Sequence, residues 1–184
     1  MNNPSSKDRQ DAESNGHLAG IVFISLPLNL QDKFAELELD PERLLPVETG
    51  TQDDKWNIAE LTWEMIVSGM LKILAWKPDH EDADYYRRFI RKVKPELQRE
   101  LAEAGIIKAR NHDYELAEEI FRALVGLEPA NGRFLLNLAL LFEERASVYR
   151  NLENPALQDN YEQLAFLWYR NTLSLDDVPV EAYL

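Results

Sequence analysis

The sequence contains no cysteine, so disulfide bonds, thiolate metal sites and cysteine nucleophiles are excluded. No apolar run in it approaches the roughly 18 residues that a membrane-spanning helix needs. Its seven glycines are scattered, and none forms the glycine-rich loop that holds a phosphate group. These absences favour a cytoplasmic chain that binds no cofactor and does not act on a membrane.

Positive charge is scarce. The chain of 184 residues has 20 basic and 33 acidic side chains, which gives a net charge of −13. An acidic surface repels the phosphate backbone and anionic lipids, so a general nucleic-acid or membrane-surface function is disfavoured. An apolar content of 45% with four tryptophans is typical of a folded domain. The charge fits either a basic partner surface or simple solubility.

The segment Leu18–Leu30 is the one candidate for a secretory signal. It is interrupted by Ser25 and Pro27, its upstream flank has no positive bias, and no small-residue cleavage site follows it. We therefore expect no secretion.

The first third of the chain has no helical periodicity. Residues 1–17 are polar and unpatterned, which predicts a disordered tail. The β-branched run Ile21–Ile24 predicts a strand or extended segment. Pro41, Pro46 and Gly50 follow, so we expect residues 18–56 to form an extended arm packed on helices, with a helical turn at 41–45.

From Asn57 onward, apolar residues recur at spacings of three and four, which predicts helices. Prolines and short polar clusters divide the pattern into segments. The fold class is therefore all-α over a helical domain of residues 57–184, with predicted helices at 57–76, 79–94, 96–110, 114–126, 132–152 and 155–174.

One stretch carries a repeat signature, running from Ala104-Gly105 through Asp113-Tyr114, Ala117 and Phe121 to Pro129. In this spacing it resembles the tetratricopeptide repeat (TPR) family. The resemblance implies a hairpin of two antiparallel helices, with Gly105 allowing close approach and Ala117 at the crossing. His112 stands at a turn position where the family often has glycine.

A second unit can be placed by the same period. Ala139 follows Gly105 by 34 residues, the family period. Ala165, however, follows Ala117 by 48 residues, an excess of 14, or about two additional turns in each helix. The resemblance therefore implies an α-solenoid fragment with one regular and one elongated repeat. Val180–Leu184 is expected to begin a further helix that the sequence does not complete.

The resemblance implies a non-enzymatic module that binds a peptide or helix of another protein in a concave groove. TPR domains that capture a terminal carboxylate use a Lys and two Asn; here those places hold Ala102, Ile106 and Asn137, so this subclass is not expected. The alternative function is self-association through the elongated hairpin and the uncovered last repeat. The residues expected to line the groove are Arg110, Arg133, Leu136, Asn137, Leu140, Glu143 and Glu144.

Two charged clusters lie at the two ends of the helix predicted at 79–94. The acids of residues 79–84 are at its start, where negative charge stabilises the first turn; this interpretation is preferred to a cation site, and no metal is expected. The basic cluster is either a structural helix end, with Asp84 pairing Arg88, or a partner-binding patch. It consists of Arg87, Arg88, Arg91, Lys92 and Lys94.

The three histidines, His17, His80 and His112, fall in a tail, at a helix start and in a turn. None has a neighbouring Ser or Asp in the pattern of a catalytic triad. With no other catalytic motif in the sequence, we expect the chain not to be an enzyme.

Overall fold

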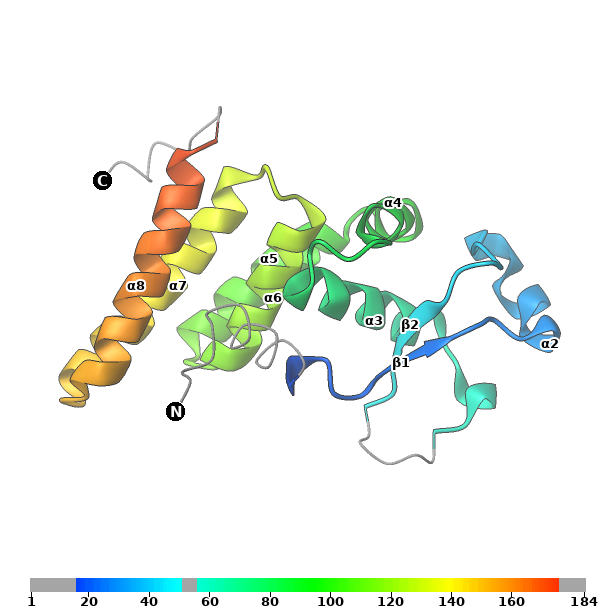
Figure 1. The fold of residues 1–184 in the computed structure, drawn as a ribbon, viewed down its shortest axis with the longest axis horizontal. Coiled ribbons are helices and arrows are strands. Elements are labelled where there is room, and N and C mark those ends of the chain that lie inside the picture. The colour runs from blue at the N-terminus through cyan, green and yellow to red at the C-terminus, as the bar shows by residue number, and fades with distance from the viewer. Residues whose placement is uncertain (1–15, 51–55, 176–184) are drawn as a thin grey trace, which may run out of the picture. The chain divides into compact units, whose positions relative to one another are not determined.

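The computed structural model describes residues 16–50 and 56–175. The chain is mostly helical, with helices packed in antiparallel pairs and a small two-stranded sheet near the N-terminus (Figure 1). It divides into two compact units, residues 1–95 and residues 96–184, and the division lies inside the predicted helical domain. Residues 1–15 of the predicted tail and the further helix expected at 180–184 lie outside the described residues.

In the first unit, strand β1 (Ile21–Ile24) pairs antiparallel with β2 (Leu45–Glu48), Ile21 opposite Glu48 and Ile24 opposite Leu45. The predicted strand at 21–24 is confirmed. The helical turn predicted at 41–45 is wrong, because the chain enters β2 at Leu45. Helix α2 (Leu28–Gln31) and 3-10 helix η1 (Asp32–Leu37) precede it.

Helix α3 (Trp63–Trp76) begins six residues later than the periodicity predicts. Asn57 instead caps a short 3-10 helix, η2 (Ile58–Glu60). Thr62 then stops the backbone from continuing as one helix: it is extended, and its hydroxyl accepts a hydrogen bond from the Met65 N–H at 3.3 Å. A side-chain acceptor at this position satisfies an N–H that has no partner within the helix.

Helix α4 (Ala83–Val93) is also shorter than its predicted range. Asp82 precedes it but makes no side-chain hydrogen bond to the first turn. Its carboxylate instead pairs with Arg43, which also bonds Asp40 at 2.9 Å and lies 5.1 Å from the centre of the Tyr85 ring. Asp82 thus does not cap α4 as expected; it forms an ion pair that joins the arm to the start of α4.

The arm packs on α3 through β2, whose Leu45 and Val47 are fully buried. Gly69 of α3 makes this contact close: a Cβ atom there would overlap the carbonyl oxygen of Pro46 and lie 2.6 Å from its carbonyl carbon. At the end of β2, the Glu48 carboxylate lies 2.5 Å from the Lys72 Nζ and also accepts a hydrogen bond from Ser68.

Tyr86 of α4 is fully buried, and its hydroxyl has no hydrogen-bond partner among the described residues. Burial raises its pKa to about 12, an effect that the nearby Arg43 partly opposes. A buried hydroxyl without a partner loses its hydrogen bonds to water on folding, which costs stability.

Replacing Tyr86 with phenylalanine is therefore expected to raise the free energy of unfolding by about 1 kcal/mol at neutral pH. The folded pKa lies above the unfolded value near 10, so the wild type loses stability as pH rises from that value. The variant has no hydroxyl to ionise, and its advantage grows above pH 10. Urea unfolding at pH 7 and at about pH 11 measures both effects; a less stable variant at both pH values contradicts the prediction.

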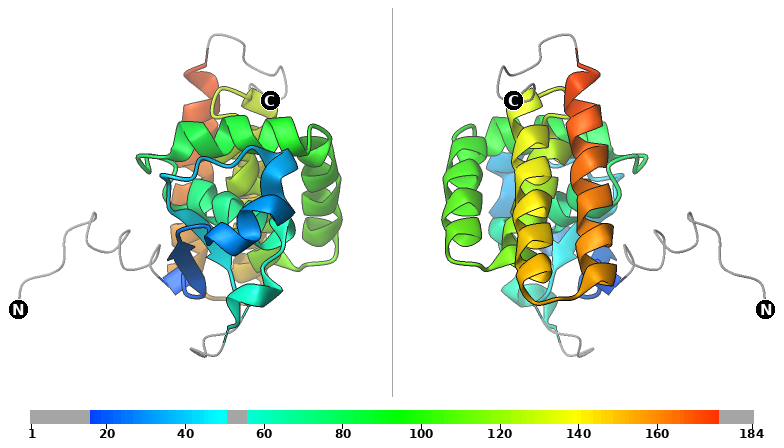
Figure 2. Two further views of the ribbon diagram at one scale, coloured as in Figure 1. Left: turned by 90° about the vertical axis from the view of Figure 1, so that its right-hand side faces the viewer. Right: turned by 90° about the vertical axis from the view of Figure 1, so that its left-hand side faces the viewer.

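The second unit consists of two antiparallel helical hairpins. Helices α5 (Leu97–Arg110) and α6 (Tyr114–Leu127) have 14 residues each. Helices α7 (Gly132–Asn151) and α8 (Pro155–Leu173) have 20 and 19 and lie side by side along their length (Figure 2). All four ranges agree with the predicted helices to within two residues, and the second hairpin is the longer one, as the spacing predicts.

Each of these hairpins turns through a residue with positive φ. His112 has φ 60° and Glu153 has φ 53°. This left-handed conformation favours glycine and follows helix ends in proteins generally. Asn131 and Asn154 then begin α7 and α8 with side-chain caps, to Arg133 N–H at 3.1 Å and Leu157 N–H at 3.2 Å.

The crossing of α5 and α6 depends on Gly105. A Cβ atom there would lie 2.5 Å from Cε1 of Phe121, which is buried. The small Ala117 is fully buried at the same interface. The core continues through α6 into the second hairpin and consists of Ala117, Phe121, Leu124, Leu138, Leu141, Phe142 and Ala165.

Within residues 16–50 and 56–175, no helix combines the length and the apolar character needed to cross a membrane.

Candidate functional site

Six of the seven predicted groove residues lie on α7, and Arg110 ends α5. Leu140 is 49% exposed at the middle of the helix, whereas Leu136 is 7% exposed and belongs to the core. Asn137 is half-buried, and Arg133, Glu143 and Glu144 are exposed. These residues form a surface of α7 in which one apolar side chain is surrounded by charged and amide groups. We call this surface the Leu140 stripe; it consists of Arg133, Asn137, Leu140, Glu143 and Glu144.

Two carboxylates of this stripe are held by tyrosines from opposite sides. The Tyr169 hydroxyl of α8 donates to Glu143 at 2.5 Å, and the Tyr114 hydroxyl of α6 donates to Glu144 at 3.0 Å. Burial and then the bond to a carboxylate raise the pKa of both hydroxyls. The two glutamates are thus bonded to different neighbouring helices, and the exposed Leu140 lies about one helical turn before them on α7.

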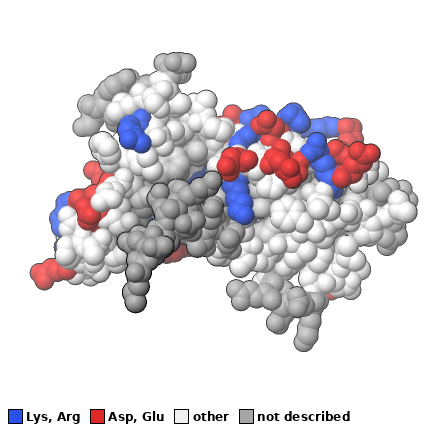
Figure 3. All heavy atoms as spheres, in the orientation of Figure 1, with Lys and Arg blue, Asp and Glu red and all other residues white. Residues whose placement is uncertain are grey.

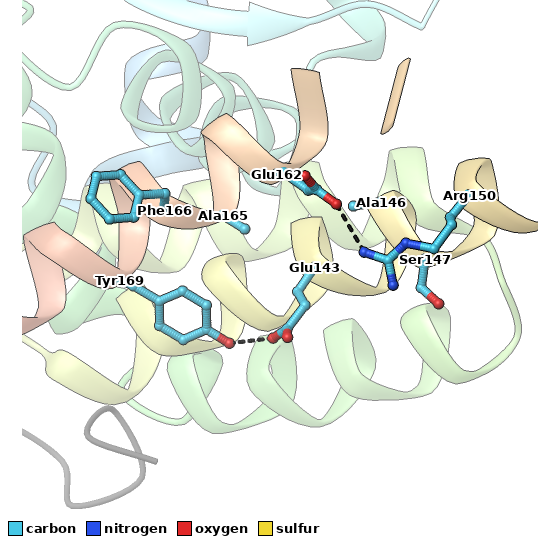
Figure 4. A pocket seen from close by; sticks show the side chains of 8 residues that line it. All are labelled: Glu143, Ala146, Ser147, Arg150, Glu162, Ala165, Phe166 and Tyr169. Atoms are coloured by element: carbon cyan, nitrogen blue, oxygen red, sulfur yellow. Dashed lines mark hydrogen bonds and ion pairs between the residues drawn. The ribbon is translucent and has the colours of Figure 1, made fainter. Parts of the chain in front are cut away.

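A second feature is a hollow between α7 and α8, with a volume of about 410 Å³. Figure 4 shows the Tyr169–Glu143 hydrogen bond at one end and the Arg150–Glu162 ion pair, 2.9 Å long, at the other. A hydrogen bond from Gln158 and then the contact with Arg150 hold the pKa of Glu162 below its usual value. The lining residues are Glu143, Ala146, Ser147, Arg150, Glu162, Ala165, Phe166 and Tyr169.

Arg145 of α7 contacts both α6 and α8, and the sequence analysis did not single it out. Its side chain is 8% exposed and donates to Glu118 at 2.9 Å and to Glu115 at 3.1 Å, both on α6. Its guanidinium lies 4.3 Å from the centre of the Tyr161 ring of α8. A signal was present: Arg145 falls on the face of α7 where the periodicity otherwise places apolar residues.

Two residues of the predicted basic patch, Arg87 and Lys92 of α4, form ion pairs with acidic side chains. Arg87 pairs with Asp84 at 2.7 Å and donates to the Pro78 carbonyl oxygen at 3.0 Å, so the expected partner Arg88 is not the residue that Asp84 bonds. Lys92 pairs with Glu38 of the arm. Figure 3 shows Lys and Arg near α4 interleaved with Asp and Glu. These pairs favour the structural interpretation of Arg87 and Lys92.

The remaining candidates do not converge on a reaction centre. His17 stacks on Trp76 at 3.5 Å, His80 lies 5.9 Å from the ring of Phe23, and His112 Nδ1 lies 2.7 Å from the Tyr114 hydroxyl. Among the described residues, no group of three or more His, Asp or Glu side chains is placed to hold a metal ion.

Ala102 and Ile106, the places that the carboxylate-binding subclass fills with Lys and Asn, lie on α5 and carry no polar side chain. The chain was compared with protein-family models, with curated proteins and with solved structures, and none of the three comparisons gave a match.

Proposed function

We propose that the chain is a non-enzymatic protein-binding module whose second unit is built from TPR-like hairpins. The observation that carries this proposal is the Leu140 stripe, an exposed leucine 49% accessible at the centre of a long helix and flanked by polar side chains. Binding surfaces of this kind place one apolar anchor within polar groups that fix orientation. The occupant is an extended peptide or an amphipathic helix of another cytoplasmic protein.

Local geometry supports the TPR-like part of the proposal. Gly105 lies against Phe121, Ala117 is buried at the crossing, and the turn before Tyr114 uses a left-handed residue. These are the places at which the repeat needs a small or conformationally permissive residue. The module uses no cofactor or metal ion, and its partners are neither nucleic acids nor membranes.

The charges of the stripe indicate what the partner presents. Glu143 and Glu144 are already bonded to tyrosine hydroxyls, and each carboxylate retains acceptor capacity. Arg133 is exposed at the other end of the stripe. A segment with an apolar residue flanked by a basic residue on the side of the glutamates fits this arrangement.

Replacing Leu140 with aspartate tests the proposal. The immobilised full chain is used to capture proteins from an extract of its source cells. The partner retained by the wild type is expected to fall at least about tenfold with Leu140→Asp, because the apolar anchor is replaced by a charge. Quantitative mass spectrometry of the captured proteins measures the change.

Leu152→Asp is the matched control, since Leu152 is 67% exposed but lies in the turn after α7. It is expected to retain the partner at the wild-type level. Equal recovery of every captured protein with the wild type and both variants would remove the Leu140 stripe as the binding surface.

A further inference from the structure

The outer face of the second hairpin carries a projecting ring beside a depression. Phe166 is 69% exposed on α8. It borders the hollow between α7 and α8, whose lining includes the small residues Ala146, Ser147 and Ala165, with Ser147 beside Arg150 at one end (Figure 4). An aromatic ring that projects next to a depression with a small-residue floor is self-complementary, which is the requirement for a two-fold symmetric interface.

The charges along α8 have the same symmetry. Glu162 lies four residues before Phe166 and Arg170 lies four residues after it, about one helical turn in each direction. All three side chains are exposed. When two α8 helices run antiparallel and are centred on Phe166, Glu162 of each copy lies opposite Arg170 of the other. Glu162 pairs with Arg150 within the chain, and its carboxylate has capacity for a second donor.

We propose that this face is a dimerisation surface for a second copy of the same chain, with the two α8 helices antiparallel about Phe166. The ring of each copy enters the hollow of the other, and two Glu162–Arg170 ion pairs set the register. This surface shares Glu143 with the Leu140 stripe, but its anchor is Phe166 and its occupant is a second copy of the chain, so the proposal does not depend on the proposed function.

The size of the face sets the expected affinity. Helix α7 has 20 residues, so the face is about 30 Å long, and two helices of about 10 Å give an area near 600 Å² per copy. Stable interfaces bury about 800 Å² per partner. A smaller surface with one aromatic anchor is expected to give a dissociation constant of about 1–100 μM.

Sedimentation velocity of the full chain over about 1 μM to 1 mM is expected to show a monomer–dimer equilibrium. Phe166→Asp is expected to raise the dissociation constant by about 30-fold or more, because it removes the central anchor. Leu152→Asp, a leucine with a similar exposure of 67% outside this face, is expected to leave the constant unchanged. Circular dichroism confirms that each variant is folded.

A charge exchange tests the register. Glu162→Arg and Arg170→Glu each place like charges opposite one another in the homodimer, and each is expected to weaken dimerisation about fivefold or more. An equal mixture of the two variants is expected to dimerise more tightly than either variant alone, since the charges at positions 162 and 170 of one copy then face their opposites in the other. A purely structural effect of either substitution is not rescued by mixing.

A wild type that remains monomeric over the whole concentration range overturns the proposal. Dimerisation that Phe166→Asp leaves intact overturns the assigned face, and failure of the mixture to recover overturns the antiparallel register. Loss of captured partner with Leu140→Asp can accompany any of these results, so the two proposals fail independently.

Discussion

Replacing Gly69 with alanine is expected to destabilise the first unit by about 2 kcal/mol or more, although alanine is the better helix former by about 1 kcal/mol. The added Cβ overlaps the Pro46 carbonyl oxygen and lies 2.6 Å from the carbonyl carbon and 2.9 Å from the Val47 nitrogen. All three are backbone atoms of β2, so no side-chain rotation relieves the contact. The strand must move away from α3, which exposes Leu45 and Val47. Hydrogen exchange by mass spectrometry is expected to show faster exchange in β1 and β2.

Gly105→Ala is the matched comparison, because its Cβ meets a side chain instead. The nearest atom is Cε1 of Phe121 at 2.5 Å, and a smaller residue at 121 removes it. Adding Phe121→Leu is therefore expected to recover part of the loss from Gly105→Ala, a favourable coupling in a double-mutant cycle. If Gly69→Ala is as stable as the wild type and the β2 amides exchange no faster, the prediction that depends on the close approach of β2 to α3 is contradicted.

The sequence predicted the second unit more accurately than the first, and the cause is where the boundary signals lie. In the second unit, local residues mark the helix boundaries: Pro129 lies two residues after α6, Pro155 is the first residue of α8, and the Asn131 and Asn154 caps act within three residues. Such signals depend on residues close together in the sequence, so they can be recognised without knowledge of the fold.

The first unit depends on contacts between distant residues. Strand β2 is extended because Leu45 and Val47 are buried on α3 and because it pairs with β1. In this ladder Leu45 lies opposite Ile24, which is 21 residues earlier in the sequence. Asp82 is the N-cap residue of α4, but its carboxylate accepts a hydrogen bond from Arg43, 39 residues away, and none from the first turn of the helix. Pairings at this separation are not encoded in local periodicity, so the local preference of Pro41 predicts a helix start although the residue lies in a turn.

For the candidate groove residues, the sequence indicates which helix carries them but not their burial or their hydrogen bonds. The repeat spacing placed candidate residues on α7, yet periodicity alone did not separate the buried Leu136 from the exposed Leu140. It also did not anticipate that two tyrosines from neighbouring helices bond Glu143 and Glu144. These contacts depend on how α7 packs between α6 and α8, and Arg145 contacts both of these helices.

Replacing Arg145 with methionine is expected to lower the free energy of unfolding of the second unit by about 3 kcal/mol. Methionine retains the length of the side chain but leaves Glu118, whose side chain is 15% exposed, without its bond at 2.9 Å. Glu118 keeps Arg122 at 2.8 Å, and Glu115 turns to solvent, so the loss is smaller than for an isolated buried charge. The cation contact with Tyr161 is also lost.

Two further variants separate charge from packing. Arg145→Lys keeps the charge but cannot bond Glu118 and Glu115 at once through two nitrogens as the guanidinium does. It is expected to lose roughly half as much stability as Arg145→Met. Glu115→Gln removes the exposed partner and is expected to cost less than about 0.5 kcal/mol. Urea unfolding followed by circular dichroism ranks the three, and an Arg145→Met variant no less stable than Glu115→Gln contradicts the role assigned to the guanidinium. Because Glu144 precedes Arg145 on α7, the same substitution is expected to weaken partner capture through the Leu140 stripe without touching Leu140 itself.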